Sequence, residues 1–422
     1  MIISRRDFLR IGAIPMLGLN LQDYLKIDPP AKKRKSVIFF HLLGGPSHID
    51  TYDPKPDAPD EIRGPYNTIE TNVPGLFLGE LLSEQAKIAD KLFIIRSFTH
   101  DNPDHGGAQF LVLRGRESAA NHYPAFGAVL SHLRDRNDLM PYIFMGNRQN
   151  QIIHDIGNMG ILQSRFRPKL IERDPNGPDF KIDELSLVSD VSEERILSRR
   201  NILEVLDSLR AKNDILDGFD DNQMRAFEII TSGKVANAFN INEEPEKLRN
   251  QYGRTDIGQR ALLARRLIEV GVGFVTVEHS PPEKNNYGWD HHVDLPKWFP
   301  MAVTPYDQAI SSLVLDLEER GLLNDVLIIA FGEFGRTPKI NSYSGRDHWP
   351  RAGSVLLAGS GISGGKVYGS TDKRGYDVRD PIHPSDLLAT IYKNIGFNPS
   401  TRIVDKNNQS HFISEGKPIK LF

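Results

Sequence analysis

The sequence predicts an α/β protein built around a buried and largely parallel β-sheet. Two observations indicate this class: short, continuous apolar runs recur along the chain, and segments with apolar residues at three- and four-residue spacing lie between them. This alternation is typical of strands joined by helices. The 422 residues, 39% apolar and 25% charged, are enough to bury a full core.

Six apolar runs are predicted to be the buried strands. The first, residues 36–45, ends in two glycines, as expected for a strand covered on both faces of a parallel sheet. The other predicted strands are residues 91–98, 140–146, 272–279, 325–335 and 353–361.

Helices are predicted between these strands from the spacing of their apolar residues. They cover residues 77–90, 122–136, 256–272 and 386–397. Residues 183–252 are richer in charge and in helix formers, so we expect a helical insertion packed on one main domain of residues 36–422.

The first 35 residues are predicted to be an export signal followed by a basic linker. Residues 4–9, "SRRDFL", resemble the twin-arginine motif S-R-R-x-F-L, and a short, weakly apolar stretch follows them. That stretch is interrupted by Pro15 and is shorter than the ~20 apolar residues that cross a bilayer. We therefore expect export by the twin-arginine machinery to the periplasm or cell envelope, without a transmembrane span.

Composition excludes several classes of function. The net charge is −3 and the positive charges are dispersed apart from Lys32–Lys35, so no basic face for nucleic acid is expected. The chain has no cysteine, which excludes disulfides, thiolate nucleophiles and cysteine metal sites. Any metal would be held by histidine nitrogens and carboxylate oxygens.

Polar side chains gather directly after four of the predicted strands. Ligand sites in an open parallel sheet lie beyond the carboxyl ends of the strands, so these side chains are expected to face one site. Carboxylates brought together repel one another unless a cation neutralises them, which predicts a divalent metal. The residues are Ser47, His48, Asp50 and Asp53; His100, Asp101, Asp104 and His105; Glu278, His279, Asp290, His291 and His292; and Glu333, Asp347 and His348.

Five motifs resemble the bacterial family called domain of unknown function 1501, within the alkaline phosphatase and sulfatase superfamily. They are "GGPSHIDTYDPKP", "GWDHH", "GEFGRTP", "GRDHWP" and "HPSDLLATIYKNIGF", in this order. The resemblance extends from the N-terminal signal almost to the C-terminus. It implies a three-layer α/β/α sandwich around a mixed, mainly parallel sheet, with a metal site like that of arylsulfatases and alkaline phosphatases.

The resemblance also implies a set of metal ligands. Asp290 and His292 are similar to an Asp-His pair of the superfamily, Glu333 to its late-strand acid and His348 to its final histidine. A mixture of histidines and carboxylates favours Zn or Mn, with Ca or Mg as alternatives. The other candidate ligands are His291, Asp347 and Asp50, the last because glycines replace the first-strand acids.

The nucleophile is the main departure from the superfamily pattern. His105 stands where relatives carry Ser, Thr or a modified Cys, so its role is a candidate catalytic one. Three possibilities remain open: Ser47 is the nucleophile, a metal-bound hydroxide attacks with a histidine as general base, or catalysis is lost. Arg336 either clamps a phosphate or sulfate oxygen or pairs with Glu333.

Two functions follow from this pattern. The first is an exported, metal-dependent hydrolase of sulfate or phosphate esters, including esters carried on polysaccharides. The alternative is a noncatalytic binding protein of the cell envelope that keeps the sulfatase-like fold.

Overall fold

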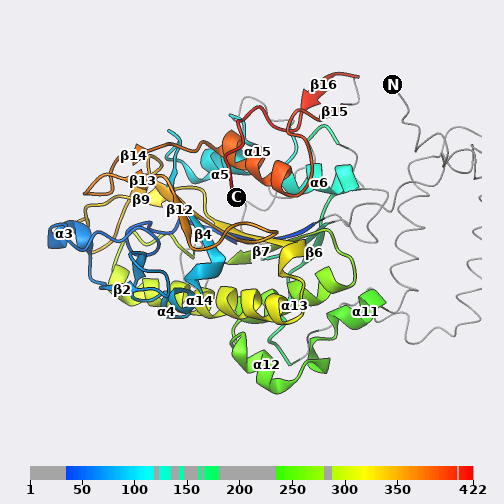
Figure 1. Cartoon of the computed structure of the whole chain (residues 1–422), viewed down its shortest axis with the longest axis horizontal. Coiled ribbons are helices and arrows are strands. Elements are labelled where there is room, and N and C mark those ends of the chain that lie inside the picture. The colour runs from blue at the N-terminus through cyan, green and yellow to red at the C-terminus, as the bar shows by residue number, and fades with distance from the viewer. Residues whose placement is uncertain are drawn as a thin grey trace, which may run out of the picture. The chain divides into compact units, whose positions relative to one another are not determined.

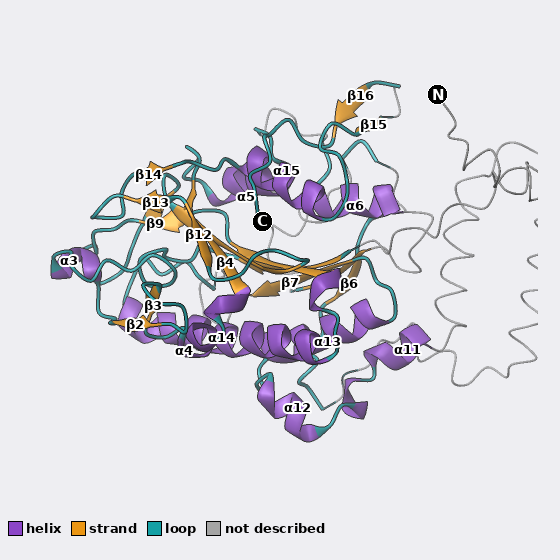
Figure 2. Cartoon of the chain, viewed as in Figure 1, coloured by secondary structure: helices purple, strands orange, loops and turns teal. Residues whose placement is uncertain are grey.

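The computed structural model describes residues 35–117, 123–134, 142–146, 160–162, 166–178, 180, 234–279, 288–405 and 408–421. Within these ranges an eight-stranded sheet lies between two layers of helices, which confirms the predicted α/β/α sandwich (Figure 1). Figure 2 shows the sheet edge-on with helices on both sides. The predicted signal and most of the predicted insertion lie outside the described residues.

The central sheet is mixed and mainly parallel, as predicted. Its strand order is β12-β4-β11-β8-β1-β7-β5-β6, and only the pairs that β11 makes with β4 and β8 are antiparallel. The strands are β1 (Ser36–Leu42), β4 (Leu92–Phe98), β5 (Tyr142–Met145), β6 (Lys169–Ile171), β7 (Phe274–His279), β8 (Val326–Phe331), β11 (Gly353–Gly359) and β12 (Lys366–Tyr368). All six predicted strands are therefore confirmed.

Strand β1 explains why the runs are apolar throughout. It lies between β7 and β8, and its alternate residues enter two different cores. Val37 and Phe39 pack on one face of the sheet, whereas Ile38 and Phe40 pack on the other. A strand buried on both faces has no polar side, so its sequence is continuously hydrophobic.

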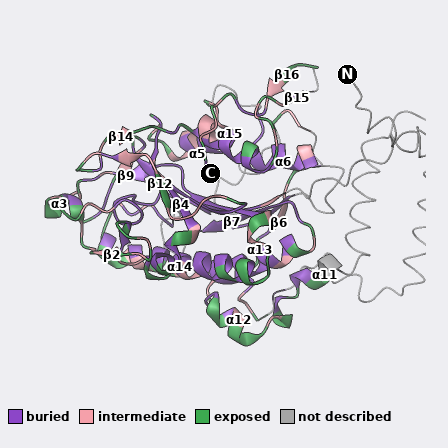
Figure 3. Cartoon of the chain, in the orientation of Figure 1, coloured by how far each residue is buried: buried purple, intermediate pink, exposed green. Residues whose placement is uncertain are grey.

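In the described residues, helices cover both faces of the sheet. One layer contains α4 (Ser83–Lys87), α13 (Asp256–Glu269) and α14 (Leu295–Glu319), and the other contains α5 (His105–Arg114), α6 (Phe126–Arg134) and α15 (Pro384–Asn394). Figure 3 shows that α13 and α14 bury the sides that face the sheet. The helices predicted at 122–136, 256–272 and 386–397 are confirmed.

The helix predicted over residues 77–90 is wrong in its first part. Phe77–Gly79 forms strand β3, which pairs with β2 (Thr68–Glu70), and only Ser83–Lys87 is helical as α4. A Cβ at Gly79 would lie 2.3 Å from the Asp50 carbonyl oxygen. Strand β3 therefore packs against the loop that follows β1. The apolar spacing of residues 77–90 does not reveal this contact.

Helix α14 was not predicted, although it spans 25 residues. Its interior contains Pro300 and Pro305, each of which removes a backbone hydrogen bond. Burial of Phe299, Tyr306 and Leu313 in the core offsets that loss. Packing has here overridden the local sequence signal.

Shorter elements complete the described structure. They are α3 (Asp60–Arg63), η2 (Ala89–Lys91), α11 (Lys234–Phe239), η5 (Ile241–Glu243), α12 (Glu246–Gln251), η6 (Leu323–Asp325), β9 (Gly335–Arg336), β10 (His348–Trp349), β13 (Ser370–Thr371), β14 (Val378–Arg379), β15 (Arg402–Val404) and β16 (Ser410–Phe412). In the part of the chain that is described, no helix has both the length and the apolar character needed to cross a membrane.

The direction of the strands positions the site. Strands β1, β4, β7 and β8 all run the same way, because β11 is antiparallel to both β4 and β8. Their carboxyl ends therefore meet at one edge of the sheet. The loops that follow these strands carry the candidate site residues.

Candidate metal centre

The Asp290 carboxylate is surrounded by three histidines that come from distant parts of the chain. Asp290 Oδ2 lies 3.3 Å from His105 Nε2, and Oδ1 lies 2.9 Å from His292 Nε2 and 3.2 Å from His348 Nε2. One ligand atom from each of His105, Asp290 and His348 falls within 4.8 Å of the others. The side chains converge closely enough to surround one ion.

Each histidine of this cluster arrives on a different segment. His105 is the first residue of α5, after β4, and Asp104 caps that helix by accepting a hydrogen bond from Gly107 N at 2.8 Å. His292 follows Asp290 in the loop between β7 and α14, and His348 begins β10. The strand directions, rather than proximity in sequence, bring these residues together.

A hydrogen bond at Nδ1 fixes the orientation of all three rings. The acceptors are carboxylates or a carbonyl, so each Nδ1 carries the hydrogen, and in the neutral ring the Nε2 lone pair faces Asp290. The pairs are His105 with Glu333 Oε1 (2.5 Å), His292 with Asp347 Oδ1 (2.8 Å) and His348 with the Pro103 carbonyl (2.7 Å). Metal-binding histidines are held in this way by their second nitrogen.

Three lone pairs directed at a carboxylate repel it unless a positive charge lies among them. Burial lowers the pKa of His105, but its bonds to Asp290 and Glu333 outweigh burial and raise that pKa to about 9. Burial likewise raises the pKa of Asp290, yet the three histidines and Arg336 hold it far below its usual range. Arg336 already supplies one positive charge at Asp290 Oδ1, and a proton or a metal ion among the three histidine nitrogens would add a second.

The donor set fits a divalent metal. His292 Nε2 lies 3.0 Å from His348 Nε2, so at most one hydrogen fits between these two nitrogens. Three imidazole nitrogens and a carboxylate oxygen are donors that zinc takes, and manganese takes the same types. His105, Asp290, His292 and His348 would hold such an ion.

Glu333 is buried next to His105 and accepts a hydrogen bond from its Nδ1. Its side chain is 0% exposed, and both carboxylate oxygens accept from Gly44 N, at 3.0 and 3.1 Å. Burial raises the pKa of Glu333, but the bond to His105 lowers it below its ordinary value overall. Glu333 was predicted to be a metal ligand; among the described contacts, its carboxylate reaches the cluster by bonding to His105.

Gly44 explains the glycines that replace the first-strand acids of the superfamily. Its φ is +110°, and a Cβ there would lie 2.6 Å from Asp290 N and 2.8 Å from Trp289 N. A side chain at this position would push the Asp290 loop away. The glycine lets that loop close over the end of β1 while its amide holds Glu333.

Arg336 is buried behind Asp290. Its Nε donates to the Gly45 carbonyl at 2.9 Å, its Nη1 to the Arg346 carbonyl at 3.1 Å, and its Nη2 to both the Gly44 carbonyl and Asp290 Oδ1. The guanidinium thus fixes Asp290 by charge and by hydrogen bonds. It pairs with Asp290 and not with Glu333, the partner considered from the sequence.

Ser47 and Asp50 form a separate buried group. Ser47 Oγ donates to Asp50 Oδ2 at 2.5 Å, and Arg346 donates to the same carboxylate from Nε at 2.7 Å and from Nη2 at 3.1 Å. All three side chains are buried. None of their described hydrogen bonds reaches the Asp290 cluster.

The two remaining candidates differ in exposure. The His291 ring is buried and packs edge-on against Phe299, with 5.7 Å between ring centroids. The Asp347 side chain is 53% exposed and also accepts from Asn341 Nδ2 at 3.1 Å. Asp347 therefore contacts the cluster by orienting His292.

Sequence reasoning missed two kinds of contribution to this site. The sequence suggested a catalytic role for His105, and the structure places its Nε2 3.3 Å from Asp290 Oδ2, beside His348. The Pro103 carbonyl and the Gly44 amide were not anticipated. Every residue has backbone groups, so the residue types do not indicate which of these groups contact the site.

The fold and the cluster define a mixed α/β sandwich protein with a histidine-aspartate centre at the carboxyl edge of its sheet. The model of the family described as "Protein of unknown function (DUF1501)" matches residues 34–420. The chain belongs to the DUF1501 family, as its motifs indicated. No curated protein matches the chain.

Several solved structures are similar at low identity. Ps i-CgsB in complex with k-i-k-neocarrahexaose has a TM-score of 0.42 and 11% identity, covering 91% of this chain and 75% of that one. The PsFucS1 sulfatase from Pseudoalteromonas sp. has a TM-score of 0.38 and 11% identity, covering 93% and 72%. The phosphonate monoester hydrolase SpPMH from Silicibacter pomeroyi has a TM-score of 0.39 and 12% identity, covering 92% and 76%.

Proposed function

We propose that this protein is a metal-dependent hydrolase of phosphate or sulfate esters. One observation carries the proposal: three histidines, each anchored at Nδ1, direct Nε2 at the carboxylate of Asp290. A cation bound among the three nitrogens would relieve their repulsion from the carboxylate, which Arg336 relieves from one side, at Oδ1. Zn is the first choice for the ion and Mn the second, because the donors are mostly nitrogen.

The proposed ligands are His105, Asp290, His292 and His348. When bound, the ion would supply Lewis-acid activation of a water molecule and of an ester oxygen. Asp50 is left out of the ligand set because Arg346 and Ser47 already occupy its oxygens. His105 moves from a catalytic role to that of a ligand.

Three other side chains orient the ligands. Glu333 and Asp347 hold His105 and His292, and Arg336 holds Asp290. Among the three rings, His292 is the most exposed at 39%, so it lies on the side of the cluster that a substrate would reach first. We therefore assign Arg336 a positioning role in place of an oxyanion clamp.

The class of substrate is supported by the motifs. They resemble a superfamily of arylsulfatases and alkaline phosphatases, whose substrates are sulfate and phosphate esters, including those on carbohydrates. Ser47 is not proposed as the nucleophile, because its hydroxyl donates to Asp50 inside a buried group. Attack by an activated water is the route that requires no side-chain nucleophile.

Export is the second part of the proposal. The "SRRDFL" motif at residues 4–9 supports recognition by the twin-arginine machinery and delivery to the periplasm or cell envelope. Replacing both arginines, Arg5→Lys with Arg6→Lys, is expected to leave the protein in the cytoplasm. Cell fractionation of the double variant measures this, and unchanged export would rule out the twin-arginine route.

A noncatalytic binding protein is the alternative function. It is favoured by His105 at the nucleophile position and by the complete engagement of Arg336 with protein acceptors. Such a protein would retain the metal as a structural or ligand-binding element. The two candidates differ in turnover, not in metal binding.

Hydrolysis assays on the purified chain separate the two candidates. The substrates are p-nitrophenyl phosphate, p-nitrophenyl sulfate and a sulfated oligosaccharide, assayed after chelation and after addition of Zn or Mn. The hydrolase predicts metal-dependent turnover that Asp290→Asn abolishes and His411→Gln leaves intact. His411 is a matched control, since it pairs with Asp405 at 3.1 Å on β16. Metal-loaded protein without turnover would favour the binding protein.

A further inference from the structure

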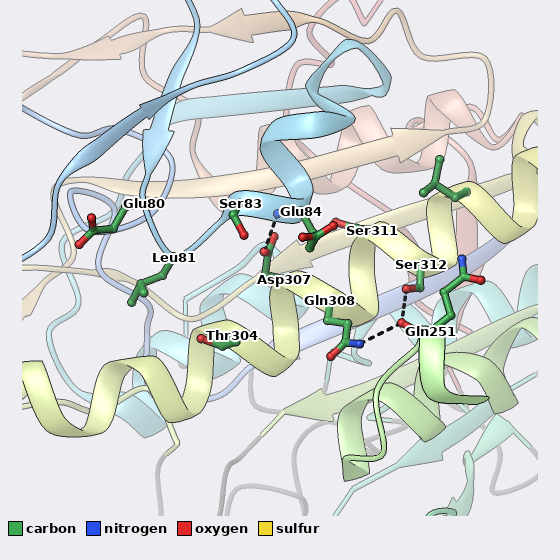
Figure 4. A pocket seen from close by; sticks show the side chains of 11 residues that line it. Glu80, Leu81, Ser83, Glu84, Gln251, Thr304, Asp307, Gln308, Ser311 and Ser312 are labelled. Carbon is green, nitrogen blue, oxygen red and sulfur yellow. Dashed lines mark hydrogen bonds between the residues drawn. The ribbon is translucent and has the colours of Figure 1, made fainter. Parts of the chain in front are cut away.

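A second pocket, of about 500 Å³, lies between α14, α4 and the end of α12. Figure 4 shows the side chains that line it, most of them on one stretch of α14. It shares no residue with the Asp290 cluster. Its volume falls within the range of small-molecule sites.

The pocket wall is a polar face of α14. Its polar residues on α14 are Thr304, the pair Asp307 and Gln308, and the pair Ser311 and Ser312. Each group lies three or four residues after the one before, so their side chains lie on one side of the helix. The opposite side of α14 carries core residues. This helix therefore presents hydroxyl, amide and carboxylate groups to the pocket.

Ser311 is the unusual member of this wall. It is 4% exposed, and its Oγ has no hydrogen-bond partner among the described residues. The neighbouring Ser312 Oγ, by contrast, donates to the Gln251 carbonyl at 2.7 Å. A buried hydroxyl without a partner is costly, and a ligand in the pocket would supply the missing bond.

The charged side chains that line the pocket are all acidic. Glu80, Glu84 and Asp307 line it, and no lysine or arginine does so in the part of the chain that is described. The Asp307 carboxylate accepts from the backbone amides of Glu84 and Gln85, at 2.8 and 2.9 Å, which fixes it at the start of α4. Lys87 bonds to Glu84 at 2.6 Å from outside the lining.

We propose that this pocket binds a small organic amine through its ammonium group. Ammonium hydrogens would be donated to Ser311 Oγ and to the Glu84 carboxylate, whose Oε1 also accepts from Lys87. A bare metal ion fits less well, because backbone amides already engage both Asp307 oxygens and the volume far exceeds one ion.

Calorimetric titration of the full chain tests this assignment. The probes are putrescine, spermidine and glucosamine, with 1,4-butanediol as the uncharged match for putrescine and with Mg and Ca chlorides. At least one amine is expected to bind while butanediol does not. Butanediol binding as well as putrescine, the metal salts alone binding, or no probe binding at all would each overturn the assignment.

Variants locate the binding to this pocket. Ser311→Ala and Glu84→Gln are each expected to weaken the amine by about tenfold or more. Glu319→Gln on the exposed end of the same helix is the matched control and should leave binding unchanged. Asp290→Asn should also leave it unchanged, which separates this inference from the proposed hydrolase. Binding of the amine with the parent affinity in both pocket variants would contradict the proposal.

Discussion

Glu333 Oε1 lies 2.5 Å from His105 Nδ1, although the two residues are 228 positions apart in the chain. Glu333 is fully buried, and Gly44 N donates to its carboxylate. This contact turns the His105 ring so that Nε2 faces Asp290. The buried Glu333 carboxylate thus orients a histidine of the Asp290 cluster.

Glu333→Gln is expected to weaken metal binding by about 10- to 100-fold while the protein stays folded. The amide can still accept from His105, but it removes the charge that makes the ring a stronger ligand. Competition with a chelator measures the affinity, and Glu319→Gln is the control. An unchanged affinity would show that Glu333 does not act through His105.

Gly44→Ala is expected to disturb the site more than its small size suggests. The new Cβ would lie 2.6 Å from Asp290 N, in a backbone conformation that L residues rarely adopt. Metal content and the midpoint of urea unfolding should both fall. The matched control is Gly271→Ala, which has φ +99° but no atom within 4 Å of its Cβ. Equal losses in the two variants would attribute the effect to backbone strain alone.

The buried pair of Asp50 and Arg346 is expected to support stability rather than metal binding. Arg346→Met leaves the Asp50 carboxylate buried without its partner, which costs about 3 to 5 kcal/mol. Combining it with Asp50→Asn should cost less than the sum of the two single changes. Urea unfolding measures the free energies. Additive losses, or loss of metal in Asp50→Asn alone, would contradict this role.

Stability is expected to fall between about pH 6.5 and pH 4. Burial lowers the pKa of His279 from 6.5 to about 4, although its Nε2 bonds to the Ala302 carbonyl at 2.9 Å. Between these pH values His279 binds a proton in the unfolded chain but stays neutral in the native chain. The free energy of unfolding therefore decreases as pH falls. His41 and His48 are shifted in the same direction.

His279→Gln should flatten this pH dependence by at most about 3 kcal/mol between the two limits. The comparison is the free energy of unfolding of the variant and the parent at each pH. His383→Gln, at the exposed start of α15, is the control and should keep the parent slope. Identical slopes for His279→Gln and the parent would show that this histidine titrates alike in both states.

The sequence was most informative where burial is complete. Strands such as β1 and β8 are buried on both faces, so their apolar runs marked them without ambiguity. Helix α14 was not predicted, because the two prolines within it argue against a helix more strongly than its apolar spacing argues for one. Residues 77–79 were predicted to be helical because their strand forms only by pairing with β2, which a short stretch of sequence does not reveal.

The site could be anticipated only in outline. The rule that ligands gather at strand ends brought the right loops together, including those of Asp290 and His348. Which nitrogen faces which oxygen depends on side-chain directions, such as the Pro103 carbonyl turning His348. The bond between Asp50 and Arg346 could not be anticipated, because the two residues lie 296 positions apart in the chain.

Metal content by mass spectrometry is the measurement that tests the account most directly. It compares the protein, purified without added chelator or metal, with Asp290→Asn, His348→Gln and the control His411→Gln. The account predicts close to one Zn or Mn ion per chain in the parent and in His411→Gln, with little metal in the two cluster variants. A folded parent without metal, even after incubation with Zn and Mn, would contradict the proposed centre and the hydrolase built on it.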